Sequence, residues 1–270
     1  MKTSYLFCFI IVSFALASCQ WGVPSKQKDT TSVDTLSYTY KNIHERAADC
    51  GNKPDSACAV VTIKYPVFTG QKKLNDSIIH KLTGLFVMSS EEKPDSTIEL
   101  MNKAFFKSYD DLKKTEPKLA MYYKLNSYAK VILQDSSLTT LEVGGDTYQG
   151  GAHGAAATFF INWDTKANKD LTLDDIFTAG YKDKLRVIAE GIFRKDEKLS
   201  PTASLANDYF FKDNKFALND NFLISPVGLK FFYNSYEIKP YAGGTTTLII
   251  PYPSIKSLLR PGSVVSKYIK

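Results

Sequence analysis

The chain has 270 residues, enough to bury a substantial core in one large domain or two small ones. Its formal net charge is +6, from 34 Lys and Arg against 28 Asp and Glu, and the two signs are interspersed along the sequence. No basic stripe of the kind that binds nucleic acid is present, so we expect no nucleic-acid partner. The charge leaves only a weak attraction to anionic cell-wall polymers.

The N-terminus has the features of an export signal. Met1-Lys2 is a short basic start, and the run from Tyr5 to Ala17 is almost entirely apolar. That run has about 13 residues, whereas a membrane-spanning helix needs about 20, so it fits a cleaved secretory signal. Leu16-Ala17-Ser18-Cys19 resembles the lipobox of bacterial lipoproteins, in which the signal is cut before the cysteine. The alternative is an ordinary signal with an incidental cysteine.

We therefore expect residues 1–19 to be a lipoprotein signal peptide and Cys19 to be the lipid anchor. Stable anchoring requires more than one acyl chain, which a lipoprotein cysteine provides. Residues 20–35 are polar and predict a flexible tether. The predicted location is the cell envelope, with the protein anchored to the outer membrane and facing either the periplasm or the cell surface.

Cys50 and Cys58 remain beyond the anchor. In an oxidising compartment, a close pair of cysteines favours a structural disulfide. A redox pair and a metal site are the alternatives. A zinc site is disfavoured because the spacing of Cys50 and Cys58 is not the Cys-x2-Cys of many zinc sites, and no nearby histidine completes a ligand set.

The first half of the folded part predicts a hairpin followed by two helices. Residues 36–46 and 57–68 alternate in the manner of strands, and the segment between them contains turn residues. Apolar residues at helical spacing then predict helices over 73–88 and 97–114. Ser96 precedes the second helix as a candidate N-cap.

Three consecutive strands are predicted in the middle of the chain, at 119–133, 138–147 and 156–163. They suggest an antiparallel meander. The later elements are a capped helical turn at 171–177, a helix at 181–198, three short strands at 222–224, 228–233 and 245–250, and a final short helix at 254–259. This pattern predicts an α+β fold, with antiparallel sheets, helices packed on one face, and two closely associated subdomains. We place the subdomains at 36–136 and 137–270.

The loop Tyr148-Gln149-Gly150-Gly151-Ala152-His153-Gly154 connects two of these strands and could serve three roles. Its glycines permit positive φ angles, so it could be purely a hairpin tip. His153 could also act as a base or as a metal ligand, or Tyr148, Gln149 and His153 could contact a ligand. A metal site needs three or four ligands, and no local spacing supplies them. We therefore predict no metal, no cofactor and no assigned catalytic residue.

A second candidate ligand-binding group is Tyr236-Glu237 with Tyr241. Tyrosine rings can stack on the apolar faces of sugars, while a carboxylate accepts hydrogen bonds from sugar hydroxyls. The alternative is an ordinary turn, whose geometry Pro240 and the following glycines would supply. Glu237 and Asp146 could in principle form a glycosidase pair, but nothing in the sequence places them together.

Several of these motifs occur in the order found in a known family. They are the Tyr148–Gly154 loop, residues 171–177, 216–218, 228–233 and 236–244, and Ile250-Pro251-Tyr252. This set resembles the domain of unknown function found in lysozyme-sensing anti-sigma-V factors and, as a non-catalytic part, in PdaC-type peptidoglycan deacetylases. Tyr65-Pro66, followed by Leu74-Asn75, resembles the smaller domain that usually precedes it.

The resemblance implies a non-catalytic α+β envelope domain that recognises glycan or protein ligands. The sequence shows neither a sigma-binding segment nor a deacetylase domain, so we do not expect either role to carry over. The leading hypothesis is a lipoprotein with a binding or sensing module for peptidoglycan glycan or for a wall-directed protein such as a lysozyme. The alternatives are an enzyme that deacetylates or hydrolyses wall carbohydrate, and a structural or assembly lipoprotein.

Overall fold

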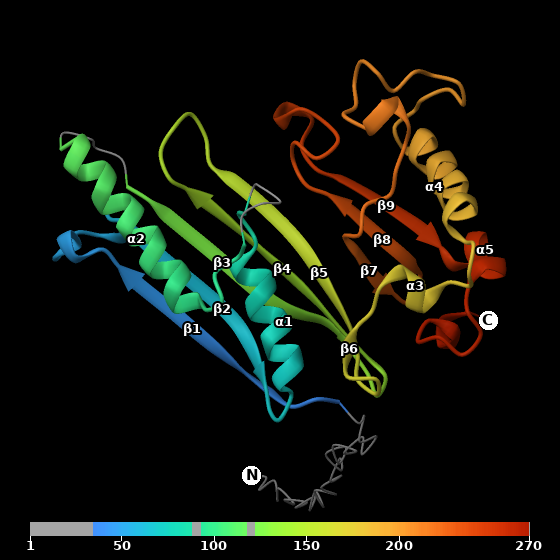
Figure 1. The fold of residues 1–270 in the computed structure, drawn as a ribbon, viewed down its shortest axis with the longest axis horizontal. Coiled ribbons are helices and arrows are strands. Elements are labelled where there is room, and N and C mark those ends of the chain that lie inside the picture. Colours follow the sequence, from blue (N-terminus) through green and yellow to red (C-terminus); the bar gives the residue numbers. More distant parts are fainter. Residues whose placement is uncertain (1–34, 88–92, 118–121, 270) are drawn as a thin grey trace, which may run out of the picture. The chain divides into compact units, whose positions relative to one another are not determined.

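The computed structural model describes residues 35–87, 93–117 and 122–269 (Figure 1). The predicted signal peptide, its Cys19 anchor and nearly all of the predicted tether lie outside the described residues. Within those residues, no helix combines the length and the apolar character that a membrane crossing requires.

The first sheet has six strands in the order β1-β2-β3-β4-β5-β6. Its strands are β1 (Tyr38–Arg46), β2 (Val60–Phe68), β3 (Lys124–Gln134), β4 (Leu138–Tyr148), β5 (Ala155–Asp164) and β6 (Lys169–Asp170). The predicted hairpin and the predicted meander are both present as antiparallel pairs. The contact between them, β2 with β3, is parallel.

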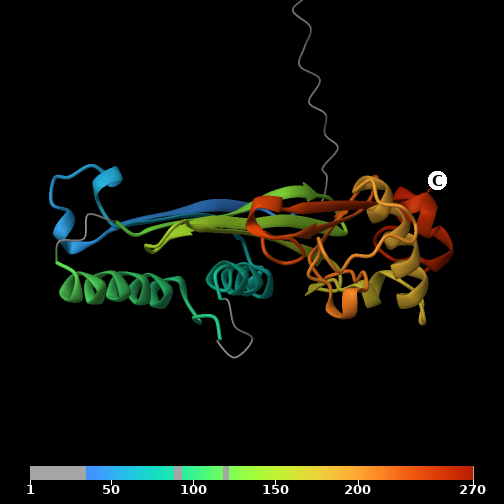
Figure 2. The same ribbon diagram turned by 90° about the horizontal axis from the view of Figure 1, so that it is seen from above.

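Two helices, α1 (Lys72–Thr83) and α2 (Ile98–Thr115), cover one face of this sheet (Figure 2). Leu74, Ile78 and Leu82 lie one turn apart on α1 and are buried against the sheet, because residues four apart share a helix face. The N-cap of α2 is Thr97 rather than Ser96, since the Thr97 side chain accepts the Leu100 N–H. These helices also supply the crossover that a parallel strand pair needs.

The loop between β1 and β2 brings Cys50 and Cys58 together. Their Cα atoms are 5.4 Å apart, a separation that a disulfide spans. Both side chains are buried in the first core, beside Ala47 and Ala59. The cysteines therefore tie this loop to the start of β2.

The second sheet has three antiparallel strands, β7 (Phe222–Ser225), β8 (Gly228–Tyr233) and β9 (Thr246–Pro251). It packs with α3 (Leu173–Ile176), α4 (Lys182–Asp196) and α5 (Tyr252–Ile255) around a second, aromatic-rich core. α3 is the predicted capped turn: Thr172 and Asp175 form a reciprocal capping box. Its single turn is fixed in this way at the point where the chain leaves the first sheet.

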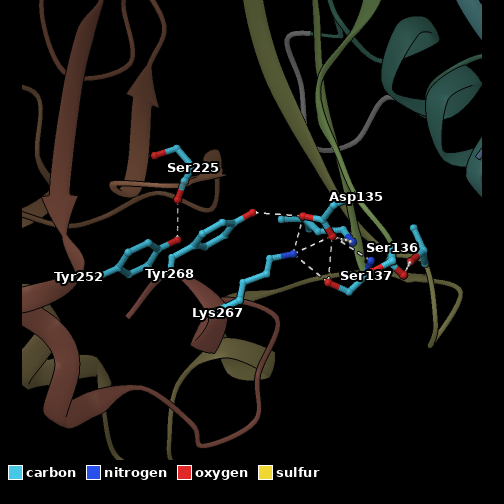
Figure 3. Close-up of polar contacts among 9 residues, drawn as sticks. Asp135, Ser136, Ser137, Ser225, Tyr252, Lys267 and Tyr268 are labelled. Carbon is cyan, nitrogen blue, oxygen red and sulfur yellow. Dashed lines mark hydrogen bonds and ion pairs between the residues drawn. The ribbon is translucent and has the colours of Figure 1, made fainter. Parts of the chain in front are cut away.

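Side-chain hydrogen bonds connect the two sheets. The buried Asn162 of β5 donates to the Phe222 carbonyl and accepts the Ile224 N–H, so its amide pairs with β7 as a short strand would. At another point, Lys267 donates to both carboxylate oxygens of Asp135 at 2.7 and 2.5 Å (Figure 3). The C-terminal segment is thereby bound to the turn between β3 and β4.

The α+β prediction is confirmed: the sheets are mostly antiparallel and helices pack against them. The subdomain boundary expected at residue 136 falls in the turn between β3 and β4, inside the six-stranded sheet. The sheet continues to Asp170 because β4 and β5 pair along almost their whole length with the preceding strand.

Candidate functional site

A cavity of about 790 Å³ lies beside β5. Four segments from distant parts of the sequence form its walls: the C-terminal end of α1 with residues 85–87, the β4–β5 loop with the start of β5, residues 219–221, and residues 234–241. Its volume falls in the range of small-molecule binding sites, about 300–1,000 Å³. The cavity brings together the two groups that the sequence singles out separately.

Three of the predicted residues form a ring cluster at this cavity. The rings of His153 and Tyr241 are stacked, with centroids 4.5 Å apart and planes 10° from parallel. Tyr236 lies beside both, 5.4 Å from Tyr241, and its hydroxyl is 3.4 Å from His153 Nε2. Tyr236 and Tyr241 remain 53% and 47% exposed, so large ring surfaces face solvent at the cavity. The cluster has the form of an apolar platform with polar edges.

The β4–β5 loop holds His153 through its glycines. Gly150 and Gly151 have φ angles of 90° and 88°, a region that other residues rarely adopt. A Cβ on Gly154 would approach the Thr147 carbonyl oxygen to 2.5 Å, so the loop closes tightly there. The Tyr148 hydroxyl donates to the Gly151 carbonyl at 3.0 Å and braces the loop.

Tyr236 and Glu237 belong to a tight turn after β8. The Glu237 N–H donates to the Asn234 carbonyl, and Glu237 accepts the Asn234 N–H at 2.8 Å in return. Tyr236 is held at φ 69°, an uncommon conformation for a tyrosine. Such strain often accompanies a functional position, and here it directs an exposed ring to the cavity.

Asparagines fix this turn against the open edge of β5. The Asn234 side chain accepts the Thr158 N–H at 2.7 Å, and the Asn221 side chain donates to the Thr158 carbonyl at 2.8 Å. Asn219 donates to Glu237 Oε1 at 2.6 Å. These amides replace a missing neighbouring strand, so they position the cavity wall without a continuous sheet.

The structure separates the remaining sequence candidates. Gln149 lines the cavity with His153, Tyr236, Glu237 and Tyr241, whereas Tyr148 supports the loop without lining it. Asp146 lies elsewhere on β4, where it accepts from Asn126 and faces Lys124 at 3.7 Å. It is therefore not paired with Glu237 across the cavity.

The other histidines are not near this cluster. His44 contacts Asp55 at 3.3 Å, and His80 is exposed on α1. Across the residues that the structure describes, no group of three or more His, Cys, Asp or Glu side chains is arranged to hold a metal ion.

A second cavity of about 670 Å³ adjoins the first. Lys81, Asn219 and Asp220 line both cavities. The second cavity carries charges of both signs, supplied by Lys81, Asp170, Asp174, Lys182, Arg186 and Asp220. Burial, together with the hydrogen bond to Asp174 and its charge, raises the pKa of Tyr181 in its wall to about 12. This hydroxyl therefore stays protonated at neutral pH.

Sequence reasoning did not find the asparagines or Lys81. Asn219-Asp220-Asn221 and Asn234 have the composition of ordinary turns, and Lys81 is one of many lysines. No local pattern marks them, because each acquires its role from a contact with a segment more than 60 residues away in the sequence or from a cavity.

Comparison with known families gives two matches. Residues 52–156 match the family model "Deacetylase PdaC", and residues 174–253 match "Protein of unknown function (DUF3298)". The predicted domain combination is confirmed. The two matches indicate a cell-wall-related combination whose second member is described only as a protein of unknown function. None of the curated proteins matches the sequence.

Two solved structures share the fold. A DUF3298 family member from Bacteroides fragilis is 27% identical, with a TM-score of 0.68, and the match covers 87% of this chain and 97% of that one. A DUF3298 family protein from Pseudomonas aeruginosa is 22% identical, with a TM-score of 0.65 and coverage of 85% and 96%. The two parts of this chain therefore occur together in a recurring architecture.

Proposed function

We propose that this chain is an envelope lipoprotein whose folded part is a non-catalytic module that binds cell-wall glycan. The ring cluster of His153, Tyr236 and Tyr241 at the first cavity carries the proposal. Exposed rings beside hydrogen-bonding side chains are what a sugar requires, since its C–H faces are apolar and its edges carry hydroxyls. The match to a family described as a deacetylase of the PdaC type supports a carbohydrate ligand over other small molecules.

The polar groups of the cavity have distinct roles in this proposal. Glu237 already accepts from Asn219 and Asn234, so it orders the turn as well as offering acceptor oxygens to a ligand. Asp220 and Gln149 are exposed at the walls and offer further acceptors and donors for sugar hydroxyls. Binding energy would come mainly from the rings, because an exposed hydrogen bond to a sugar replaces one to water.

Cys19 would attach this module to the outer membrane, with residues 20–35 as the tether. Metabolic labelling with a fatty-acid analogue tests the anchor, and a Cys19→Ala variant should lose the label. The Cys50–Cys58 pair would be a structural disulfide in that oxidising compartment. A thiol assay on the unfolded, unreduced protein should find neither cysteine free.

Pull-down of residues 20–270 on purified, insoluble peptidoglycan tests the proposed ligand. We expect retention, and we expect Tyr241→Ala to weaken it about tenfold or more, the scale of losing one stacked ring. Tyr40→Ala is the matched control, because Tyr40 is 40% exposed and lies on β1 outside the cavity. Equal retention of the two variants, or no retention of the parent chain, contradicts the proposal. Retention on immobilised lysozyme alone would redirect it to a wall-directed protein.

Carbohydrate modification is the second candidate, since the match described as a deacetylase covers residues 52–156 and includes His153. Mass spectrometry of wall fragments after incubation with the protein, with and without added zinc, separates the two functions. Loss of an acetyl group or cleavage of a glycosidic bond, abolished by His153→Ala, would establish an enzyme. Unchanged masses together with retention on peptidoglycan would support a binding module.

A further inference from the structure

The second cavity has a composition unlike that of the first. Beside the ring cluster the walls are mainly aromatic and small residues, among them Ala155, Ala156 and Ala157. The charged side chains in those walls are Lys81, Asp220 and Glu237. The adjoining cavity of about 670 Å³ shares Lys81 and Asp220 and adds Lys182, Arg186, Asp170 and Asp174, so it carries three cations and three carboxylates. A neutral sugar forms no ion pairs, so the more highly charged second cavity suits a charged part of the ligand, while the aromatic rings of the first cavity suit the sugar.

Lys81 lines both cavities and is held in place there. Its side chain is half-buried near the end of α1, and its ammonium lies 5.7 Å from the centre of the Phe159 ring. Within the described part of the chain it forms no ion pair, whereas the cavity's Arg186 faces Glu190 at 3.3 Å. A cation that is partly desolvated and held against a ring gains strongly from a ligand carboxylate.

Asp220 is the acidic counterpart of Lys81. It is exposed, and it also lines both cavities between Asn219 and Asn221, which are fixed by hydrogen bonds to β8 and β5. Across the second cavity, Asp174 is engaged by Tyr181 and Asp170 by Ser77. Asp220 is therefore placed to face a ligand ammonium while Lys81 faces a ligand carboxylate.

We infer that the ligand is a glycopeptide: a sugar that carries a short peptide with both carboxylate and ammonium groups. This inference rests on the proposed glycan-binding function. The sugar stacks on His153, Tyr236 and Tyr241 in the first cavity, and the peptide branch lies in the second. Lys81 and Asp220, at the junction, bind the charges of the branch.

The test compares two ligands that differ only in the branch. Disaccharide–peptide units are released from purified peptidoglycan by a muramidase. A portion is treated with an amidase to remove the peptide, and the lactyl carboxyl that this frees is converted to its methylamide, so that the peptide-free unit carries no new charge. Calorimetry with residues 20–270 should give affinity about tenfold higher for the peptide-bearing unit, the effect of one charge-assisted hydrogen bond. Equal affinity for the two units overturns the inference while leaving glycan binding intact. Binding of neither unit contradicts the proposed function itself.

Single-residue variants test which side chains cause the preference for the peptide-bearing unit. Lys81→Met keeps the stem over Phe159 but removes the charge, and it should abolish the preference for the peptide-bearing unit without weakening the peptide-free unit. Lys81→Arg should retain the preference, and Asp220→Asn should reduce it. Lys73→Met, on an exposed position of the same helix, is the matched control and should behave as the parent chain. Tyr241→Ala should weaken both units. If Lys81→Met weakened both units equally, the assignment of the branch to Lys81 would be wrong.

Discussion

Two of the junctions between the first sheet and segments from the C-terminal half of the chain, the Asp135 junction and the cavity junction, differ in how completely their polar groups are satisfied. At the Asp135 junction, one carboxylate receives Lys267, Tyr268 and the backbone of the β3–β4 turn (Figure 3). At the cavity junction, asparagines satisfy the edge of β5, but the rings of Tyr236 and Tyr241 stay exposed. A saturated junction contributes stability, whereas exposed, strained groups on a rigid support are what a ligand can use.

The largest expected effect on stability is at a third junction, where the buried Asn162 side chain pairs β5 with β7 and provides a reference for the other two. Asn162→Ala leaves the Phe222 carbonyl and the Ile224 N–H without their partner, and each buried unsatisfied group is costly. We expect the free energy of unfolding to fall by about 2–4 kcal/mol, measured by urea denaturation. Asn126→Ala is the control. Among the described residues the Asn126 side chain bonds the exposed Asp146, so its loss should change stability by less than about 0.5 kcal/mol. If Asn162→Ala lowered the free energy of unfolding no more than the control variant does, the side-chain pairing with β7 would contribute little to stability.

The contribution of the Asp135 junction to the free energy of unfolding should depend on pH in the acidic range. Burial by itself raises the pKa of Asp135, but hydrogen bonds from Lys267 and Ser137 outweigh it and hold the pKa below its ordinary value. The contribution to stability is therefore complete above the unfolded pKa of about 4 and is lost as the pH falls through the lowered folded pKa.

Asp135→Asn should cost about 1 kcal/mol at neutral pH, since the pair is partly solvated. It should also flatten the dependence of unfolding free energy on pH below about pH 4. Urea titrations at a series of pH values measure both effects. If unfolding free energy fell with decreasing pH as steeply in the variant as in the parent chain, other carboxylates would be responsible for the fall.

The same junction should also make the free energy of unfolding depend on pH in the alkaline range, through Tyr268. Burial, followed by the charge of Asp135 and a hydrogen bond to it, raises the pKa of Tyr268 to about 12. Its contribution is present below the unfolded pKa of about 10 and is lost as the pH rises through about 12. Tyr268→Phe should reduce stability by about 0.5 kcal/mol at neutral pH and remove part of the alkaline loss. The exposed Tyr40→Phe should leave the alkaline loss as it is in the parent chain.

The smallest stability effect should come from the most exposed ring of the cavity junction. Tyr236→Gly relieves the positive φ of 69° but adds freedom to the unfolded chain, so the two terms offset each other. We expect unfolding free energy to change by less than about 0.5 kcal/mol, while binding to peptidoglycan falls. A large loss of stability would mean that the Tyr236 ring is structural, and the distinction between the two junctions would fail.

The sequence by itself determined the local elements and the identity of the candidate residues. Period-two alternation predicted β3, β4 and β5, and helical spacing predicted α1, α2 and α4. The run of residues 171–177 predicted the capped turn at α3. The same reading selected His153, Tyr236, Glu237 and Tyr241. The predictions of the elements succeeded because each depends on residues that are close in sequence, where spacing directly sets geometry. The role of the four selected residues in ligand binding stays a prediction.

Only the tertiary structure decided which of these elements and residues meet. The parallel pairing of β2 with β3, the stacking of His153 on Tyr241, and the side-chain amides of Asn162 and Asn234 at strand edges all depend on long-range packing. A strand's periodicity specifies a buried face but not the neighbouring strand. An asparagine in a turn looks the same whether it meets water or a backbone N–H across the fold.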